Sequence, residues 1–253
     1  TDVSKAISLL QAGEVVAIPT ETVYGLAANA LNADAVAKIY EAKERPSFNP
    51  LILHTHSWQA AKAYIQEYSH LHEKLAKAFW PGPLSMLFKK SEVVPDITTA
   101  GLPNVVIRVP KHPLTLALLK KLDFPLAAPS ANLSNTVSPT TAKNVSESLG
   151  NRIPYILDGG PTDVGLESTI LHCTESKIEV LREGGISREE LFTVTGIKPT
   201  DRVDKKVQAP GQLKRHYATQ KPLYLVDNLS AFLGENTFKR MAVLTYTKTK
   251  LPK

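Results

Sequence analysis

Cysteine is nearly absent from this sequence, which has one cysteine, Cys173, among 253 residues. A single cysteine excludes a disulfide framework and a zinc site built from several cysteines. No hydrophobic run approaches the roughly 18–20 residues of a membrane-spanning helix. No basic segment followed by an apolar one indicates a signal peptide. We therefore expect a cytoplasmic protein without membrane contact.

Sequence motifs of the common phosphate-binding and catalytic sites are also missing. The chain has no G-x-x-x-x-G-K-[ST] and no G-x-G-x-x-G phosphate loop. It also has no H-E-x-x-H and no G-x-S-x-G segment. We assign no metal-ligating side chains, and any catalytic site must be built in another way.

The composition indicates a folded protein whose positive charge is unevenly placed. Hydrophobic residues make up 43% of the chain and charged residues 21%, which excludes disorder as the main state. The net charge is +6, yet residues 1–197 hold 18 Lys and Arg against 20 Asp and Glu. Residues 198–222 hold seven against two, and residues 223–253 five against two. The basicity therefore belongs to a short segment and the tail.

Hydrophobic periodicity predicts alternating helices and strands. Helices are expected at 2–12, 33–43, 58–67, 70–79, 114–122, 140–149 and 187–194. Strands are expected at 15–18, 51–53, 84–89, 104–109, 125–128, 155–157, 168–173 and 177–182. Because the alternation has no strict period, it favours an α/β fold whose sheet mixes parallel and antiparallel strands. We predict a main domain over 1–197, a basic linker over 198–222, and the incomplete start of a second α/β domain over 223–253.

Four polar clusters follow expected strands or helices. They are Pro19–Gly25, Lys43–Leu51, Ala128–Asn132, and a set made of Asp158–Gly160, Glu167–Thr169 and Arg182–Gly185. Ligands of open α/β sheets bind outside the carboxyl ends of strands. Each cluster also has a simpler explanation as a turn, a helix cap, or cations at a helix C-terminus. Four clusters together favour a binding site for a small polar or phosphorylated ligand.

The motifs within these clusters resemble one known family, the YrdC-like threonylcarbamoyl-AMP synthases. The resemblance rests on Lys43-x-Arg45-Pro46, Asn49-Pro50-Leu51, Ser130-Ala131-Asn132, Ser168-Thr169-Ile170 and an opening Pro19-Thr20-Glu21-Thr22-x-Tyr24-Gly25-Leu26. Pro210 to Tyr217 resembles the interdomain linker of longer, two-domain members, although Gln212 and Leu213 depart from its usual pattern. The resemblance implies an open twisted YrdC-like sheet with flanking helices, in a chain truncated at its C-terminal end.

The resemblance also implies a reaction and a set of site residues. L-threonine, bicarbonate and ATP, with Mg²⁺, would give threonylcarbamoyl-adenylate and pyrophosphate for tRNA threonylcarbamoyladenosine modification. A downstream transferase complex would be a partner, with direct tRNA contact left open. Lys43 and Arg45 are expected to be catalytic. Expected nucleotide-binding residues are Arg45, Asn49, Asn104, Ser130, Asn132, Ser138, Arg182 and Tyr217. Expected threonine-binding residues are Thr22, His54, Arg108, Ala128 and Ser168.

Other functions remain open at this point. Arg108 could be a surface charge and His54 a core histidine. The cationic linker could be merely solvated, or Arg215, His216 and Tyr217 could fold onto ATP phosphates as a lid. The basicity suggests an alternative, a nucleic-acid-binding module in RNA or ribosome maturation. A carbamoyl-transfer domain is a further alternative, against which the single cysteine counts. No residue is clearly a general base.

Overall fold

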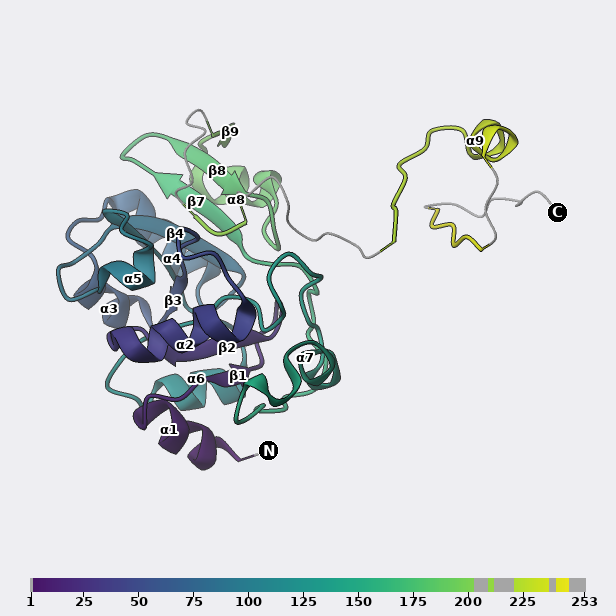
Figure 1. The fold of residues 1–253 in the computed structure, drawn as a ribbon. Coiled ribbons are helices and arrows are strands. Elements are labelled where there is room, and N and C mark those ends of the chain that lie inside the picture. Colours follow the sequence, from purple (N-terminus) through teal and green to yellow (C-terminus); the bar gives the residue numbers. More distant parts are fainter. Residues whose placement is uncertain (1, 203–208, 212–220, 237–239, 246–253) are drawn as a thin grey trace. The chain divides into compact units, whose positions relative to one another are not determined.

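A computed structural model describes residues 2–202, 209–211, 221–236 and 240–245 of the chain (Figure 1). It divides into two compact units, residues 1–218 and 219–253. The first unit therefore continues past residue 197, where the sequence patterns end the main domain. Gln212, Leu213 and the proposed lid residues Arg215, His216 and Tyr217 lie outside the described residues.

A single mixed sheet forms the centre of the first unit. Within the described residues its strand order is β1-β2-β6-β3-β5-β4-β7-β8-β9. The strands are β1 (Val16–Ile18), β2 (Gly25–Asn29), β3 (Ile52–His54), β4 (Leu84–Lys89), β5 (Asn104–Arg108), β6 (Leu126–Ala127), β7 (Thr169–Cys173), β8 (Ile178–Arg182) and β9 (Thr200–Asp201). The pairs β3–β5, β4–β7 and β8–β9 are parallel, and the remaining neighbours are antiparallel. The predicted mixed α/β sheet is confirmed.

Helices of the first unit flank the sheet, and several of them begin at a polar capping residue. The helices are α1 (Val3–Gln11), α2 (Ala33–Lys43), α3 (Trp58–Ala61), α4 (His70–Phe79), α5 (Asp96–Thr99), α6 (Pro113–Leu119), α7 (Ala142–Leu149), α8 (Arg188–Thr195) and, in the second unit, α9 (Leu229–Glu235). The Asn32 side chain accepts hydrogen bonds from the first turn of α2. Glu44 ends that helix with φ of +51°, a left-handed turn that redirects the chain between Lys43 and Arg45.

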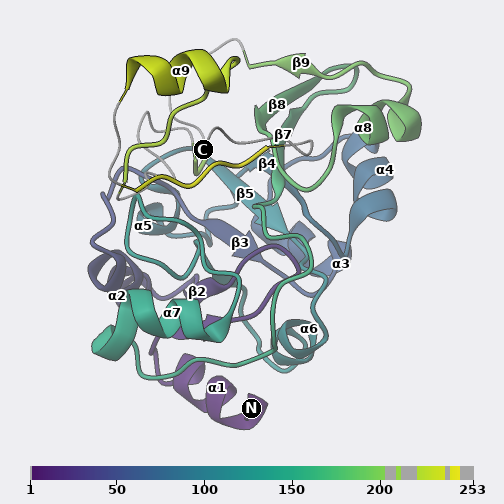
Figure 2. The same cartoon turned by 90° about the vertical axis from the view of Figure 1, so that its right-hand side faces the viewer.

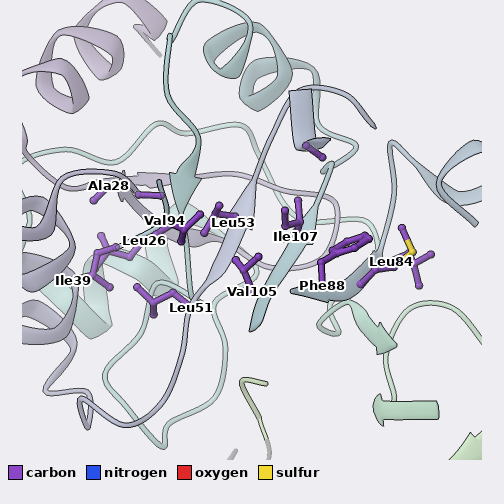
Figure 3. Close-up of a cluster of buried hydrophobic side chains, with 14 of the residues drawn as sticks. Leu26, Ala28, Ile39, Leu51, Leu53, Leu84, Phe88, Val94, Val105 and Ile107 are labelled. Atoms are coloured by element: carbon purple, nitrogen blue, oxygen red, sulfur yellow. The ribbon is translucent and has the colours of Figure 1, made fainter. Parts of the chain in front are cut away.

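The larger core lies on one face of the sheet. Alternate residues of a strand point to opposite faces, so Leu53 of β3 enters this core with Val105 and Ile107 of β5, and Leu51, just before β3, joins them (Figure 3). Side chains from α2, α4, α7 and α8 complete the same cluster. Figure 2 shows α8 beside α4, and the two helices are in contact.

The opposite face is covered unevenly, and this positions the site. At the β1 end, α1 and α6 pack side by side over a second cluster (Figure 1). Over the central strands, the third buried cluster contains strand residues and one residue from elsewhere, Ala209. Ile52 and Val106 belong to that cluster. The next residues on the same face, His54 and Arg108, are therefore available to line a cavity.

Several local predictions differ from the structure. Within the described residues the 58–67 segment forms α3 followed by a 3-10 turn, Lys62–Tyr64, in place of one helix. The expected strand at 155–157 is reduced to a single bridge between Ile156 and Ala17. β2, α5 and β9 were not predicted, because their residues show no period of their own. In β2, for example, two alanines and a glycine give too weak a hydrophobic pattern.

The second unit also departs from its prediction. The hydrophobic runs at 223–227 and 241–245 predict the first strands of this second domain, but neither run forms a strand, and α9 lies between them in the sequence. The Tyr224 and Phe232 rings pack with their centroids 5.2 Å apart. Both predicted strands need a neighbouring strand for their backbone hydrogen bonds, and the described part of this unit provides none.

Across the described parts of the chain, every helix is too short or too polar to cross a membrane.

Candidate active site

Loops from five parts of the first unit meet at one cavity on the less covered face of the sheet. Its lining residues are Thr22, Val23, Arg45, Ile52, His54, Arg108, Ala128, Pro129, Ser130, Glu167, Ser168, Arg182 and Pro210. All five predicted threonine-binding residues are among them. Three predicted nucleotide-binding residues, Arg45, Ser130 and Arg182, line the same cavity. The structure thus brings both predicted groups together, although the ligand that each residue binds stays a prediction.

Arg108 is buried at the end of β5 and is fixed from three sides. Only 4% of its surface is exposed. Its Nη2 lies 2.7 Å from the carboxylate of Glu21. Nη1 donates to Thr22 Oγ1 at 2.8 Å and Nε to the carbonyl of Gly82 at 3.1 Å. Arg108 is therefore not a surface charge. It presents an oriented guanidinium to the cavity, as recognition of a carboxylate requires.

Glu21 is equally buried and completes this arrangement. Its second carboxylate oxygen accepts a hydrogen bond from the backbone N–H of Lys111 at 2.9 Å. A buried cation without a counter-charge would be strongly unfavourable. Glu21 thus lets Arg108 stay charged inside the protein. Glu21 does not itself line the cavity, so it contacts Arg108 on the side away from a ligand.

His54 lies beside Arg108 as a neutral histidine. Burial, and then the nearby Arg108 cation, lower the pKa of His54 from 6.5 to about 3. Its Nδ1 lies 3.2 Å from the carbonyl oxygen of Ile52. His54 lines the cavity, so the alternative of a purely internal core histidine is not what the structure shows. At neutral pH it offers the cavity an uncharged polar ring.

Ser168 and Arg182 join the far side of the cavity. Ser168 Oγ is 2.7 Å from Ser85 Oγ. Arg182 donates from Nε and Nη2 to the Ser168 carbonyl at 3.1 and 2.8 Å, and from Nη2 to Ser168 Oγ at 3.1 Å. The guanidinium of Arg182 is therefore positioned by the same residue that is predicted to contact threonine.

The side chain of Arg45 binds the backbone of the loop that follows α2. Its Nε donates to the Asn49 carbonyl at 3.1 Å and its Nη2 to the Pro50 carbonyl at 2.8 Å. Burial is the largest cause that lowers the pKa of Arg45, to about 10, and the Arg182 cation adds to it. Arg45 remains charged at neutral pH. Two guanidinium groups close enough to influence each other create a place that favours a polyphosphate.

Lys43 occupies a different position from the one predicted. It is 1% exposed, and its ammonium donates to the backbone carbonyls of Ser130 and Asn132. Burial, with the Arg45 cation, lowers the pKa of Lys43 well below the usual value. Lys43 does not line the cavity. Its ammonium thus positions the Ser130–Asn132 loop, and a direct catalytic contact with phosphate does not agree with this geometry.

The two predicted asparagines are also held within loops. Asn132 donates from Nδ2 to the carbonyls of Leu133 and Thr136. Asn49 and Asn132 are 4% and 3% exposed, and the amide oxygen of each has no hydrogen-bond partner among the described residues. Neither lines the cavity in this structure. Each shapes a loop that carries a lining residue.

A further predicted nucleotide residue, Asn104, lies apart from the cavity. Asn104 shares a face of β5 with Arg108, because alternate residues point the same way. Four residues separate them, which is roughly 13 Å along a strand. Asn104 instead borders a different cavity of about 380 Å³, with Leu87, His72 and His172. Tyr217 lies outside the described residues.

Ser138 is connected to the cavity by Glu167, a residue to which the sequence analysis assigned no role. Its hydroxyl donates to Glu167 Oε1, and Glu167 lines the cavity. Glu167, Glu21 and Gly82 are the functional groups that the prediction missed. Glu21 and Glu167 lie within two of the polar clusters described above, so the sequence already indicated that they could belong to the site. The Gly82 carbonyl carries no side-chain signal at all.

Comparison with known families agrees with this geometry. The family model named Sua5_yciO_yrdC, described as "Telomere recombination", matches residues 8–184. The chain belongs to the Sua5/YciO/YrdC family. A second model, "Threonylcarbamoyl-AMP synthase, C-terminal domain", matches residues 186–251. The resemblance to two-domain members of this family is thereby confirmed.

Curated members of the family are similar over most of this chain. The threonylcarbamoyl-AMP synthase of Bacillus subtilis (strain 168) is 45% identical over 230 residues, which cover 89% of this chain and 66% of that protein. The protein of the same name from Pyrococcus abyssi is 45% identical over 228 residues, 88% of this chain and 67% of that protein. The chain thus spans about two thirds of the length of these relatives.

Solved structures of family members share the fold. The structure described as P. abyssi Sua5 complexed with L-threonine aligns with a TM-score of 0.81 at 44% identity, over 85% of this chain and 65% of that one. E. coli YciO aligns with a TM-score of 0.68 at 21% identity, over 75% of this chain and 92% of that one. The second likeness concerns the fold alone.

The described residues do not offer a resident metal site to this family member. They contain no group of three or more His, Cys, Asp or Glu side chains that could hold a metal ion.

Proposed function

We propose that this chain is an L-threonylcarbamoyladenylate synthase, a nucleotidyltransferase that converts L-threonine, bicarbonate and MgATP into threonylcarbamoyl-AMP and pyrophosphate. One observation carries the proposal. A single cavity joins a buried, oriented arginine, Arg108, to a pair of arginines, Arg45 and Arg182. The first end fits an amino-acid carboxylate, and the second fits a polyphosphate.

The residues of the cavity suit the chemistry of such a transfer. The carboxylate of threonine would bind Arg108 and Thr22, with Ser168 and the Ala128 backbone beside it. A carbamate formed at the amine would then attack the α-phosphorus of ATP, and pyrophosphate would leave. Negative charge that develops on the phosphate oxygens would be stabilised by Arg45 and Arg182. Positioning and charge stabilisation supply most of the catalysis in phosphoryl-type transfers.

Mg²⁺ is proposed as part of the substrate complex. It would bridge phosphate oxygens of ATP and neutralise their charge. The chain's own contribution is the two arginines and the loop that Lys43 holds. Lys43 acts here as a positioning residue.

The proposed product would serve threonylcarbamoylation of tRNA by a downstream transferase. The relatives' names support this role, since threonylcarbamoyl-AMP synthase is the name that both curated proteins carry. Residues 1–197 have a small excess of acids and give no support to the competing nucleic-acid-binding function.

A direct test follows pyrophosphate release from MgATP, bicarbonate and individual amino acids. We expect release with L-threonine, its loss without bicarbonate, and a product of the mass of threonylcarbamoyl-AMP. Release without amino-acid preference would contradict the proposal.

A conservative variant sharpens this test. Arg108→Lys should raise the KM for threonine at least tenfold, because a lysine ammonium cannot reproduce the planar guanidinium that Glu21, Thr22 and Gly82 orient at the cavity. Arg188→Lys is the matched control. Arg188 pairs with Glu183 on the surface at 2.7 Å and lies outside the cavity, so its replacement should leave the kinetics unchanged.

A further inference from the structure

Glu167 lines the cavity and adjoins both predicted groups of site residues. The next residue, Ser168, belongs to the predicted threonine group. The hydrogen-bond partner of its carboxylate, Ser138, belongs to the predicted nucleotide group. A carbamate that attacks the α-phosphorus must form where these two groups meet. The carboxylate of Glu167 is therefore next to the place where the amine of threonine and the α-phosphate would approach each other.

The charges of the cavity make this carboxylate distinctive. Arg45, Arg108 and Arg182 line the cavity as cations. Among the described residues that line it, Glu167 is the one acid. Glu21 neutralises Arg108 from behind, where it binds the Lys111 backbone. Glu167 alone can therefore offer negative charge directly to a ligand in this cavity.

The substrate amine needs such a group. Free threonine carries an ammonium at neutral pH, and an ammonium has no lone pair with which to attack carbon. It would also be repelled by three guanidinium groups unless an anion faced it. The charged and titratable side chains that share the cavity with Glu167 are those three arginines and His54. Arginines cannot accept a proton, and the low pKa of His54 makes it a weak base.

We propose that Glu167 is the catalytic base that takes the proton from the threonine ammonium. This inference rests on the proposed function. In the first step, R–NH₃⁺ and the Glu167 carboxylate give R–NH₂ and the Glu167 carboxylic acid. In the second, R–NH₂ and HCO₃⁻ give R–NH–COO⁻ and H₂O, as the amine lone pair forms the N–C bond and a C–O bond breaks. The carbamate oxygen then attacks the α-phosphorus, pyrophosphate leaves, and Glu167 returns its proton to water.

The backbone around Glu167 is built to hold it in place. A Cβ atom at Gly184 would lie 2.3 Å from the Glu167 carbonyl oxygen and 2.5 Å from the Ser168 carbonyl carbon. Gly185 also donates from its N–H to the Glu167 carbonyl at 3.0 Å. The two glycines of the Arg182–Gly185 motif thus let one loop lie directly against another. The Ser138 hydroxyl then fixes the rotation of the carboxylate.

The test compares the intact chain with Glu167→Gln over pH 6 to 10. Glutamine keeps the size and the hydrogen bond with Ser138, but it cannot accept a proton at its amide. We expect kcat/KM for threonine to fall by about 10²–10⁴ at pH 7, the range for loss of a general base. This loss should shrink steadily toward high pH, where threonine in solution is already an amine. KM for ATP should stay within about threefold of the wild-type value, since the arginines are untouched.

Two variants complete the design. Glu167→Asp keeps a carboxylate on a shorter stem, and it should restore part of the rate with the wild-type shape of the pH profile. Glu147→Gln, on the exposed surface of α7, is the control for the chemical change and should leave the profile unaltered.

The outcomes separate this inference from the function on which it rests. If kcat/KM for threonine in Glu167→Gln fell by the same factor at every pH, Glu167 would not be the base. A change in KM for ATP, or recovery of the rate on addition of Mg²⁺, would also contradict that role. In those cases the wild-type chain would still turn over threonine, and the proposed function would stand. A wild-type chain without threonine-dependent turnover would overturn both.

Discussion

The guanidinium of Arg108 lies 2.7 Å from the carboxylate of Glu21, and each side chain is only 5% exposed. Arg108 ends strand β5, and Glu21 lies in the loop between β1 and β2. Although Arg108 Nη2 and Glu21 Oε1 lie this close, neither atom has a hydrogen bond of good geometry among the described residues. The pair is thus an electrostatic contact buried inside the protein, and it holds the guanidinium of Arg108 in place at the cavity.

Removal of Glu21 should destabilise the protein strongly. Glu21→Gln leaves a buried cation without its counter-charge, which costs about 3–5 kcal/mol of unfolding free energy. Urea titration measures this change. Glu14→Gln is the matched control, because Glu14 binds Lys38 at the same distance of 2.7 Å but is 39% exposed. It should cost at most about 1 kcal/mol, and equal losses in the two variants would contradict the role given to burial.

Loss of the Lys43 ammonium should disturb the nucleotide end of the cavity first. Lys43→Met keeps most of the side-chain volume but leaves the carbonyls of Ser130 and Asn132 without their donor. Each buried unpaired group costs about 1–3 kcal/mol. We expect calorimetry to show ATP affinity reduced at least tenfold and threonine affinity changed less than threefold. Wild-type ATP affinity in a folded Lys43→Met chain would show that the loop does not depend on this lysine.

Gly184→Ala should push the loop that carries Gly184 away from the loop that carries Glu167 and Ser168. In Gly184→Ala the added Cβ would collide with backbone atoms of Glu167, Ser168 and Thr169 at 2.3 to 2.5 Å, so one of the loops must move. Displacement of about 1 Å at a reacting group can lower a rate by about 10², and kcat for pyrophosphate release measures it. Gly234→Ala is the control, because no atom lies within 4 Å of its Cβ position; a full rate in both variants would count against close packing here.

Acid should destabilise the folded chain through two buried histidines. Burial is the main cause that lowers the pKa of His54 to about 3 and of His72 to about 4, from 6.5. The unfolded chain therefore binds protons below pH 6.5 that the folded chain does not bind until about pH 4 and 3. Unfolding free energy should fall with falling pH in that window, by up to ~1.4 kcal/mol per pH unit for each histidine.

His72 allows this pH effect to be isolated away from the active site. Its Nδ1 accepts a hydrogen bond from the Ser69 backbone N–H at 3.1 Å, a contact that protonation would break. His72→Asn should reduce the dependence of unfolding free energy on pH between 6.5 and 4 by about half, because His54 still contributes. The same replacement at the exposed His70 should leave the slope as it is, and an unchanged slope in His72→Asn would refute the assignment.

Regular elements with a strong hydrophobic period were predictable from the sequence. α2, α4 and β4 occur at the predicted residues, because each has a clear apolar face and a capping or breaking residue at its ends. β2 and β9 could not be found this way. β9 has two exposed residues and exists only because β8 provides its hydrogen-bond partners, which is information from the folded chain.

The site was predictable as a set of residues but not as a set of roles. Motif resemblance placed Thr22, Arg108 and Ser168 in one group, and the structure brings them together. It could not separate Lys43, which binds backbone carbonyls, from Arg45, which lines the cavity, since the two are cations two positions apart. That separation depends on the left-handed conformation of Glu44 between them, a property that no charge pattern encodes.

The parallel contact between β4 and β7 also sets the order in which this protein can fold. Ser85 and Ser168 meet across 83 positions of sequence, and Arg108 reaches Thr22 across 86. Closing such long loops is slow, because chain entropy is lost before the contacts form. The cavity can therefore assemble only after Ser168 and Arg182 have joined the strands that carry His54 and Arg108. A contiguous fragment that ends before residue 168 would contain Arg45 and Arg108 but neither Ser168 nor Arg182, so the two ends of the cavity become functional together or not at all.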